Sequence, residues 1–121
     1  MANFAMALDE KGHRLFIGAR APAKLLVYDT DTGRLVTTLP IGGDVDDIFY
    51  DATRNRLYAI CGEGLISVVQ QRDPEHYDLL GTVRTALGAR TGLFVPDTGQ
   101  LYVAAPARGT STAHVRVYTA H

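Results

Sequence analysis

The sequence predicts an all-β chain built from β-propeller blades, and three observations carry this prediction. A turn with a carboxylate followed by a Leu-aromatic strand occurs three times, with the pairs beginning at Leu15, Leu57 and Leu101. These pairs are 42 and 44 residues apart, within the roughly 40 to 50 residues of a propeller blade. No segment shows the 3.6-residue apolar period of a helix over about ten or more positions. A β-sandwich also has short, regularly spaced strands, but it has no reason to repeat the internal pattern of a blade.

The first copy of the repeat is expected to hold four strands. A short innermost strand covers Phe4 to Leu8, and a turn follows at Asp9 to His13 because Asp and Gly accept the backbone angles of a tight reversal. The run Leu15 to Ala19 is apolar throughout, which predicts that both of its faces are covered. The remaining elements are the loop Arg20–Lys24, the strand Leu25–Tyr28, the hairpin turn Asp29–Gly33 and the half-exposed outer strand Arg34–Leu39.

The second and third copies repeat this order. The second is expected to have strands at Asp46–Tyr50, Arg56–Ile60, Leu65–Val69 and Leu79–Arg84, with a turn at Arg72–His76. The third is expected to have strands at Thr91–Val95, Leu101–Ala105 and Val115–Tyr118, so it lacks an outer strand. We therefore expect a single partial propeller unit over residues 1–121, with blade 1 at residues 3–42, blade 2 at residues 43–85 and an incomplete blade 3 at residues 86–121.

Three segments carry a resemblance to a known family. LLVYDTDTGRLVTTLPIGG, FYDATRNRLYAICGEGLISVVQ and LFVPDTGQLYVAAPARG resemble blades of the bacterial YVTN-repeat β-propeller proteins, most like the C-terminal three-blade portion of one. The resemblance implies four-stranded blades around a central channel lined by the innermost strands. It also implies a ring commonly of seven blades, in which the N-terminal strand completes the last blade. Three blades cannot close a ring, since propellers need about four to eight. The chain is therefore expected to be a fragment, an engineered piece or one protomer of a larger ring.

The small number of blades predicts self-association. Each blade covers its apolar faces with its neighbours, so the outer faces of blades 1 and 3 would be exposed in a monomer. The strand HVRVYTA would also present an unpaired edge. We expect a homo-oligomer, and a dimer is favoured because two copies would make six blades, whereas three would exceed the known range.

Composition limits the classes of function. The formal charge of −1 gives no field that would recruit nucleic acid or an anionic membrane, so neither is an expected partner. The single cysteine, Cys61, cannot form an internal disulfide and is expected to be buried and unreactive. No apolar run reaches the length of a membrane span, and no signal-peptide pattern begins the chain. We therefore expect a soluble chain, and the sequence leaves its cellular compartment undecided.

Polar residues gather where the innermost strands are expected to begin. Alignment on the turn carboxylates, with Asp97 taken as the counterpart of Asp9 and Asp51, brings several of them to one mouth of the channel. Carboxylates there could bind a hard cation, and an arginine could clamp an anion. The alternative is that they are polar groups hydrogen-bonded to loops. The candidate ligand-binding residues are Asn3, Asp44, Asp46, Asp47 and Arg90.

Other motifs give no chemistry. The stretch Asp29–Gly33 superficially resembles a calcium loop but lacks the required ligand positions, so it is interpreted as a hairpin turn. The four histidines lack metal-binding spacing and are expected to be solvated. No nucleophile elbow, P-loop or dinucleotide fingerprint occurs. We therefore predict no catalytic residue, no metal ligand and no cofactor.

Two functional hypotheses remain, beside the possibility that the chain is an engineered piece without evolved activity. The first is a non-catalytic repeat module that acts as a binding or assembly scaffold, with a small ligand or a protein partner at the channel mouth. The alternative is an enzyme similar to the metal-dependent lactonase propellers, with a divalent cation held by Asp46 or Asp47 together with Asn3.

Overall fold

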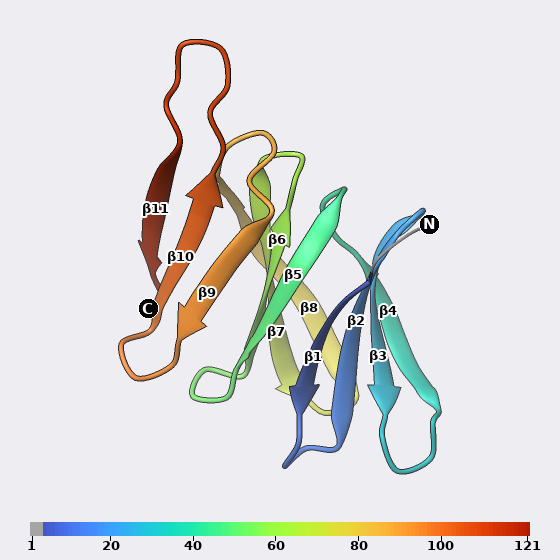
Figure 1. Ribbon diagram of the computed structural model, residues 1–121. Coiled ribbons are helices and arrows are strands. Elements are labelled where there is room, and N and C mark those ends of the chain that lie inside the picture. Colours follow the sequence, from blue (N-terminus) through green and yellow to red (C-terminus); the bar gives the residue numbers. More distant parts are fainter. Residues whose placement is uncertain (1–3) are drawn as a thin grey trace.

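The computed structural model describes residues 4–121, which form antiparallel strands in three separate sheets (Figure 1). The first sheet holds β1 (Ala5–Asp9), β2 (Arg14–Arg20), β3 (Ala23–Asp29) and β4 (Leu35–Pro40). The second holds β5 (Val45–Asp51), β6 (Arg56–Cys61), β7 (Leu65–Asp73) and β8 (His76–Arg84). The third holds β9 (Thr91–Val95), β10 (Gln100–Ala105) and β11 (His114–Thr119).

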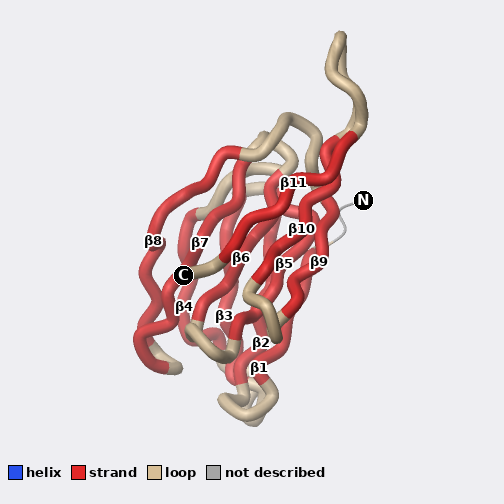
Figure 2. Tube along the Cα trace, turned by 90° about the vertical axis from the view of Figure 1, so that its left-hand side faces the viewer, coloured by secondary structure: helices blue, strands red, loops and turns tan. Residues whose placement is uncertain are grey.

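Each sheet follows chain order, so every strand pairs with its neighbour in sequence. The sheets stand side by side, and their first strands β1, β5 and β9 follow one another in contact (Figure 1). Figure 2 shows strands and connecting loops, with the β10–β11 loop projecting beyond the sheets. The described part contains no helix that could cross a membrane. The all-β prediction is confirmed, and the sheets of four, four and three strands are consistent with partial propeller blades.

Two hairpins are tighter than the sequence predicts. The expected turn Arg72–His76 belongs largely to strands, because β7 continues to Asp73 and β8 already begins at His76. The Asp73 carboxylate accepts the backbone N–H of Glu75 at 2.8 Å and lies 2.9 Å from the His76 ring, which closes the hairpin within two residues. The expected loop Arg20–Lys24 likewise reduces to the turn Ala21-Pro22, whose peptide bond is cis.

The strand registers correct the alignment of the three copies. Asp9 pairs with Arg14 and Asp51 pairs with Arg56. In the third sheet it is Val95 that pairs with Gln100, so Asp97 is not the counterpart of Asp9 and Asp51. Asp97 lies in the turn beyond β9 because this copy carries its turn carboxylate two residues later.

Two apolar cores lie in the seams between neighbouring sheets. β6 supplies both of them: Leu57, Ala59 and Cys61 face the first sheet, while Tyr58 and Ile60 face the third. The first seam is completed chiefly by Phe16, Leu25, Val27, Val45, Ile48, Val69 and Tyr77, and the second by Ile66, Ala89, Phe94, Leu101, Val103 and Ala105. Because β6 alternates between the two seams, nearly all of it is buried.

The apolar run in β2 is covered on one face only, contrary to the prediction. Phe16 is fully buried against the second sheet, whereas Leu15 and Ile17 on the opposite face are only half-buried. The physical reason is that the first sheet has a neighbour on one side. The third sheet is in the same position, and large apolar side chains are exposed on both outer faces, with Met6 57% exposed on β1 and Leu93 60% exposed on β9.

Replacing Ile60 by alanine tests the second seam. Ile60 is fully buried, so Ile60→Ala should lower the free energy of unfolding by about 2–5 kcal/mol through lost burial and an unfilled cavity. Leu87→Ala, in an exposed loop position, should change it by no more than about 0.5 kcal/mol. Urea unfolding followed by circular dichroism at one fixed protein concentration measures both. Equal effects of the two substitutions would contradict the packing described for this seam.

Candidate functional site

An alternating row of charged side chains links all three sheets at one end. Arg20, the last residue of β2, places Nη2 at 2.6 Å from the Asp46 carboxylate and 3.5 Å from that of Asp44. Arg90, just before β9, places Nη2 at 2.6 Å from the other oxygen of Asp44. The order Asp46, Arg20, Asp44, Arg90 pairs opposite charges throughout. We call these four residues the mouth cluster.

The backbone around Asp44 is shaped to hold this cluster. Asp44 has a φ of 59°, an unusual conformation for a residue with a side chain, and its carbonyl accepts the Gly62 N–H at 2.8 Å. A Cβ on Gly62 would lie 2.3 Å from an Asp44 carboxylate oxygen, so a side chain there would displace that carboxylate from its present position. On the neighbouring strand, the Arg20 Nε donates to the Val45 carbonyl at 3.2 Å. The Asp44 carboxylate is therefore set between the two arginines by the local chain path.

Asp47 follows Asp46 on β5, and its side chain contacts the third sheet and not the mouth cluster. A β-bulge at Asp46 shifts the register, so that Val45 pairs with Cys61 and Asp47 with Ile60. The Asp47 carboxylate accepts the Gly92 backbone N–H at 3.2 Å, which joins the second sheet to the third. Burial raises the pKa of Asp47 above its usual range. Its role in the structure is a seam contact.

The structure thus brings most of the predicted residues together. Asp44, Asp46 and Arg90 lie in one cluster with Asp47 beside them, while Asn3 lies outside the described residues. Arg20 was not among the predicted residues. The available signal was its position directly after the apolar run of β2. In successive meanders, the end of the second strand lies in space beside the start of the next sheet's first strand.

The mouth cluster offers few vacant oxygen ligands. Within residues 4–121, no group of three or more His, Cys, Asp or Glu side chains is arranged to hold a metal ion. Carboxylate oxygens of Asp44 and Asp46 already accept hydrogen bonds from arginine. Hard cations prefer several carboxylate and carbonyl oxygens at once. A cation here would have to displace a guanidinium, and the metal-dependent hydrolase stays a prediction.

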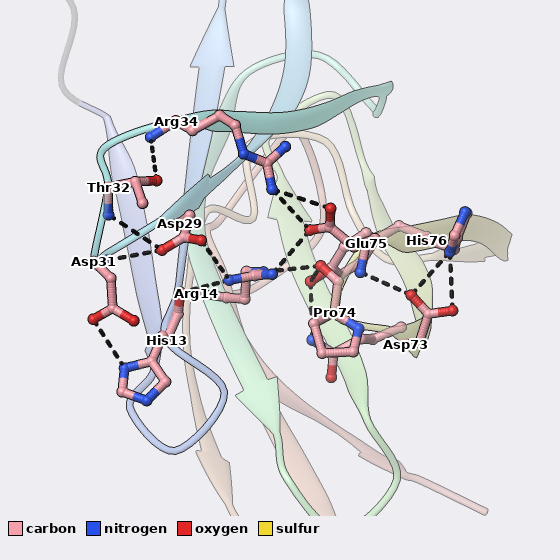
Figure 3. A network of polar contacts seen from close by, with 12 residues as sticks. His13, Arg14, Asp29, Asp31, Thr32, Arg34, Asp73, Pro74, Glu75 and His76 are labelled. Atoms are coloured by element: carbon pink, nitrogen blue, oxygen red, sulfur yellow. Dashed lines mark hydrogen bonds and ion pairs between the residues drawn. The ribbon is translucent and has the colours of Figure 1, made fainter.

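A second polar cluster lies at the opposite end of β2 and was not predicted (Figure 3). Arg14 is only 8% exposed; its Nε donates to the Pro74 carbonyl at 2.9 Å and its Nη2 to the Glu75 carboxylate at 2.9 Å. Its Nη1 lies 3.5 Å from the Asp29 carboxylate. Arg34 reaches the other Glu75 oxygen at 3.0 Å. Arginines of the first sheet therefore hold the β7–β8 turn of the second.

Burial raises the pKa of three titratable side chains in the seams. Burial raises the pKa of the Cys61 thiol to about 11, and the thiol is buried as predicted. Burial, together with a hydrogen bond to Asp51, raises the pKa of Tyr58 to about 12. Burial raises the pKa of Tyr50 as well. The histidines are exposed as predicted, and His13 and His76 contact single carboxylates.

Comparisons with known proteins show the fold and no family. No protein-family model and no curated protein matches the chain. The hydrazine synthase of Kuenenia stuttgartiensis matches with a TM-score of 0.76 at 18% identity, over 95% of this chain and 33% of that chain. A chain in the crystal structure of the mitotic checkpoint complex matches with a TM-score of 0.74 at 16% identity, over 84% of this chain and 32% of that chain. Both are propeller-containing proteins, and this chain spans about a third of each matched chain.

Metal addition tests the mouth cluster. Because arginines occupy its carboxylates, we expect Ca²⁺ or Zn²⁺ to leave the melting temperature unchanged. A site that binds only the folded state adds about 2.7 kcal/mol at a hundredfold excess over its dissociation constant. Thermal unfolding across a metal titration would reveal such a gain. Saturable stabilisation that disappears in Asp46→Asn and persists in Asp97→Asn, an exposed turn residue, would favour the hydrolase.

Replacing Asp47 by asparagine tests the cost of its buried charge. The pKa of Asp47 is raised in the folded protein, so its ionisation opposes folding, and this loss of stability appears as pH rises through that pKa. Asp47→Asn keeps an oxygen for the Gly92 N–H and removes the charge. We expect a higher melting temperature at pH 7, with the gain vanishing below about pH 4, where both side chains are neutral. A variant less stable at pH 7 than at pH 4, relative to wild type, would contradict this account.

Proposed function

We propose that this chain is a non-catalytic propeller-type module that serves as a binding or assembly scaffold and associates with a second copy of itself. The observation that carries the proposal is that its two outer sheet faces are apolar and exposed. Contiguous apolar surface of this kind marks sites of protein contact. The resemblance of the repeated segments to YVTN-repeat blades supports the same class of scaffold.

The exposed face of the first sheet corresponds to faces that are buried elsewhere in the chain. Leu15, Leu57 and Leu101 occupy the same register position. Each is the second residue of the second strand of its sheet. Leu57 and Leu101 are buried against the preceding sheet. Leu15 is half-buried because, within residues 4–121, no sheet covers this face. The outer face of the first sheet is therefore of the kind that accepts a preceding blade.

The exposed face of the third sheet corresponds to the faces that pack against a following sheet elsewhere in the chain. Phe16, Tyr58 and Tyr102 share one register position on the other side of the second strands. Phe16 and Tyr58 are buried against the following sheet, whereas Tyr102 is half-buried because the described residues form no sheet beyond the third. The third sheet of one copy is thus suited to pack on the first sheet of another. Two copies joined twice in this way would make six blades, inside the range of about four to eight.

The mouth cluster is the proposed place for a small ligand or a protein partner. The Arg90 side chain is 49% exposed and retains donors that do not contact Asp44. In a dimer, the described residues Asp44, Asp46, Asp47 and Arg90 would be present twice around one channel. No observation favours the metal-dependent hydrolase over this scaffold.

Charged substitutions on the outer faces test the proposal. We expect the wild type to have about twice the 13.1 kDa monomer mass in light scattering coupled to size-exclusion chromatography. Leu93→Glu places a charge on the third sheet's outer face and Met6→Glu does so on the first, and each should give a monomer. Leu87→Glu, on an exposed loop between the sheets, should leave the dimer intact.

Two results would contradict self-association through these faces. One is a well-folded wild-type monomer at every protein concentration. The other is a dimer whose mass is unchanged in Leu93→Glu and in Met6→Glu, since its contact would then lie elsewhere.

A further inference from the structure

A polar cleft of about 510 Å³ lies between the first and second sheets, at the end opposite the mouth cluster. The β1–β2, β5–β6 and β7–β8 turns surround it, and all three lie at the same end of the molecule (Figure 1). Its lining falls within residues 9–74, so it belongs to a seam between two sheets and not to an outer face. Its volume is that of pockets that hold small ligands, roughly 300–1,000 Å³.

An arginine fills the corresponding place in the second seam. The β1–β2 and β5–β6 turns have the same length and follow equivalent carboxylates, those of Asp9 and Asp51. Arg54 in the second turn therefore corresponds to Gly12 in the first, and Gly12 lines the cleft. The Arg54 guanidinium places Nη1 at 3.2 Å from the Asp51 carboxylate. It also lies over Gly99 of the third sheet, where a Cβ would be 3.1 Å from Nη2.

Asp9 lacks the two side-chain partners of its counterpart. Asp51 is buried, and its Oδ2 accepts the Tyr58 hydroxyl at 2.7 Å and an Arg54 N–H at 3.2 Å. The first sheet has Phe16 in place of Tyr58, and its turn has no arginine. Asp9 is half-buried, and its Oδ1 accepts a turn N–H at 3.0 Å. Within residues 4–121, no N–H group reaches its Oδ2 and it forms no ion pair.

Further acceptor oxygens stand beside Asp9. The Tyr50 hydroxyl donates to the Gln71 amide oxygen at 2.7 Å, and the Asn55 amide oxygen lies 3.3 Å from the same hydroxyl. Gln71 is buried and fixed, because its N–H donates to the Tyr77 hydroxyl at 2.9 Å. Burial and the neighbouring Asp9 charge raise the pKa of Tyr50, so the hydroxyl stays protonated. Its single proton serves Gln71, which leaves the oxygens of Asp9 and Asn55 short of donors.

The charges of the cleft favour a planar cation. Arg72 is already paired with Asp78, and Lys11 is an exposed turn residue that forms no ion pair within residues 4–121. Backbone hydrogen bonds within its hairpin lower the pKa of Asp73, which adds a second carboxylate to the lining beside Asp9. An anion would meet both carboxylates. A guanidinium presents five N–H donors in one plane and can reach several separate oxygens, whereas an ammonium is a compact point charge.

We propose that this cleft binds the guanidinium group of a ligand, in the place that Arg54 fills in the second seam. The N–H donors bond to the Asp9 carboxylate and to the Asn55 amide oxygen, as charge-assisted hydrogen bonds of a planar fork. The group is carried on an alkyl stem, either in a small guanidino compound or in an arginine of a partner polypeptide. The site is separate from the mouth cluster and from the outer faces of the sheets.

Two guanidino probes and one neutral analogue test the proposal. N-acetylarginine methylamide represents a polypeptide arginine, and agmatine represents a small compound. N-acetylcitrulline methylamide has the same shape with an uncharged urea group. NMR titration of the full chain should show saturable amide shifts at Gly12 and Asn55 with a guanidino probe. The citrulline analogue should bind at least about tenfold more weakly, because it loses the charge-assisted bonds. The tighter guanidino probe identifies which source the site prefers.

Two charge-removing variants form a matched pair. Asp9→Asn keeps an oxygen for the Gly12 N–H and removes the charge, so the preferred probe should bind about tenfold more weakly. Glu10→Gln removes the same charge from the next turn residue, which does not line the cleft, and should change the dissociation constant by less than about twofold. Lys11→Gln should tighten binding, because it removes a like charge from the lining.

A second pair tests the amide oxygen. Asn55 has a φ of 54°, which glycine accepts, so Asn55→Gly removes the side chain and retains the turn. Binding should weaken about fivefold. His13→Gly makes the same change at the register counterpart, where φ is 56° and the side chain does not line the cleft, and should leave binding unchanged.

Three results would overturn the proposal. The first is the absence of saturable shifts up to about 20 mM of either guanidino probe. The second is equal binding of the citrulline analogue, since the guanidinium charge would then play no part. The third is an equal loss of affinity in Asp9→Asn and Glu10→Gln, which would show attraction to the turn as a whole and not a site at Asp9.

Discussion

Every part of this structure depends on the need of each sheet to be covered on both faces. Only the second sheet meets this condition within the described chain, and β6 shows its effect, with consecutive residues buried in alternate seams. β2 and β10 occupy the equivalent position in their sheets, but each is buried on one face only. Because burial of apolar surface is the main favourable term in folding, the outer sheets retain an unmet demand for cover. This exposed apolar surface is the physical basis of the proposed role in assembly.

Polar contacts fix the sheets at both ends of β2. Arg14 at its start holds the β7–β8 turn, and Arg20 at its end joins the mouth cluster. Arg14 is buried among several acceptors, whereas the mouth cluster is more exposed, where an ion pair contributes about 0.2–1 kcal/mol. In both clusters the carboxylates are matched by arginines. The charged side chains of both clusters therefore join one sheet to the next.

The repeat made the three sheets predictable, since the Leu-aromatic strands recur at a blade-length spacing. The apolar run of β2 led to the wrong prediction that both of its faces are buried. The repeat sets the composition of this strand, whereas its burial depends on how many sheets lie beside it. The bulge at Asp46 and the late turn carboxylate Asp97 shifted the registers in ways that spacing alone does not reveal. Arg20 was missed because its partners are remote in sequence.

The most direct measurement of the central claim is amide hydrogen exchange followed strand by strand over a range of protein concentrations. β6 should exchange slowest at every concentration, because it opens only when both seams open. β2 and β10 should exchange faster in dilute solution and slow down as the concentration rises and their outer faces become covered. If β2 and β10 were as protected as β6 at the lowest concentration, with no dependence on concentration, the outer faces would need no partner and the account would be wrong.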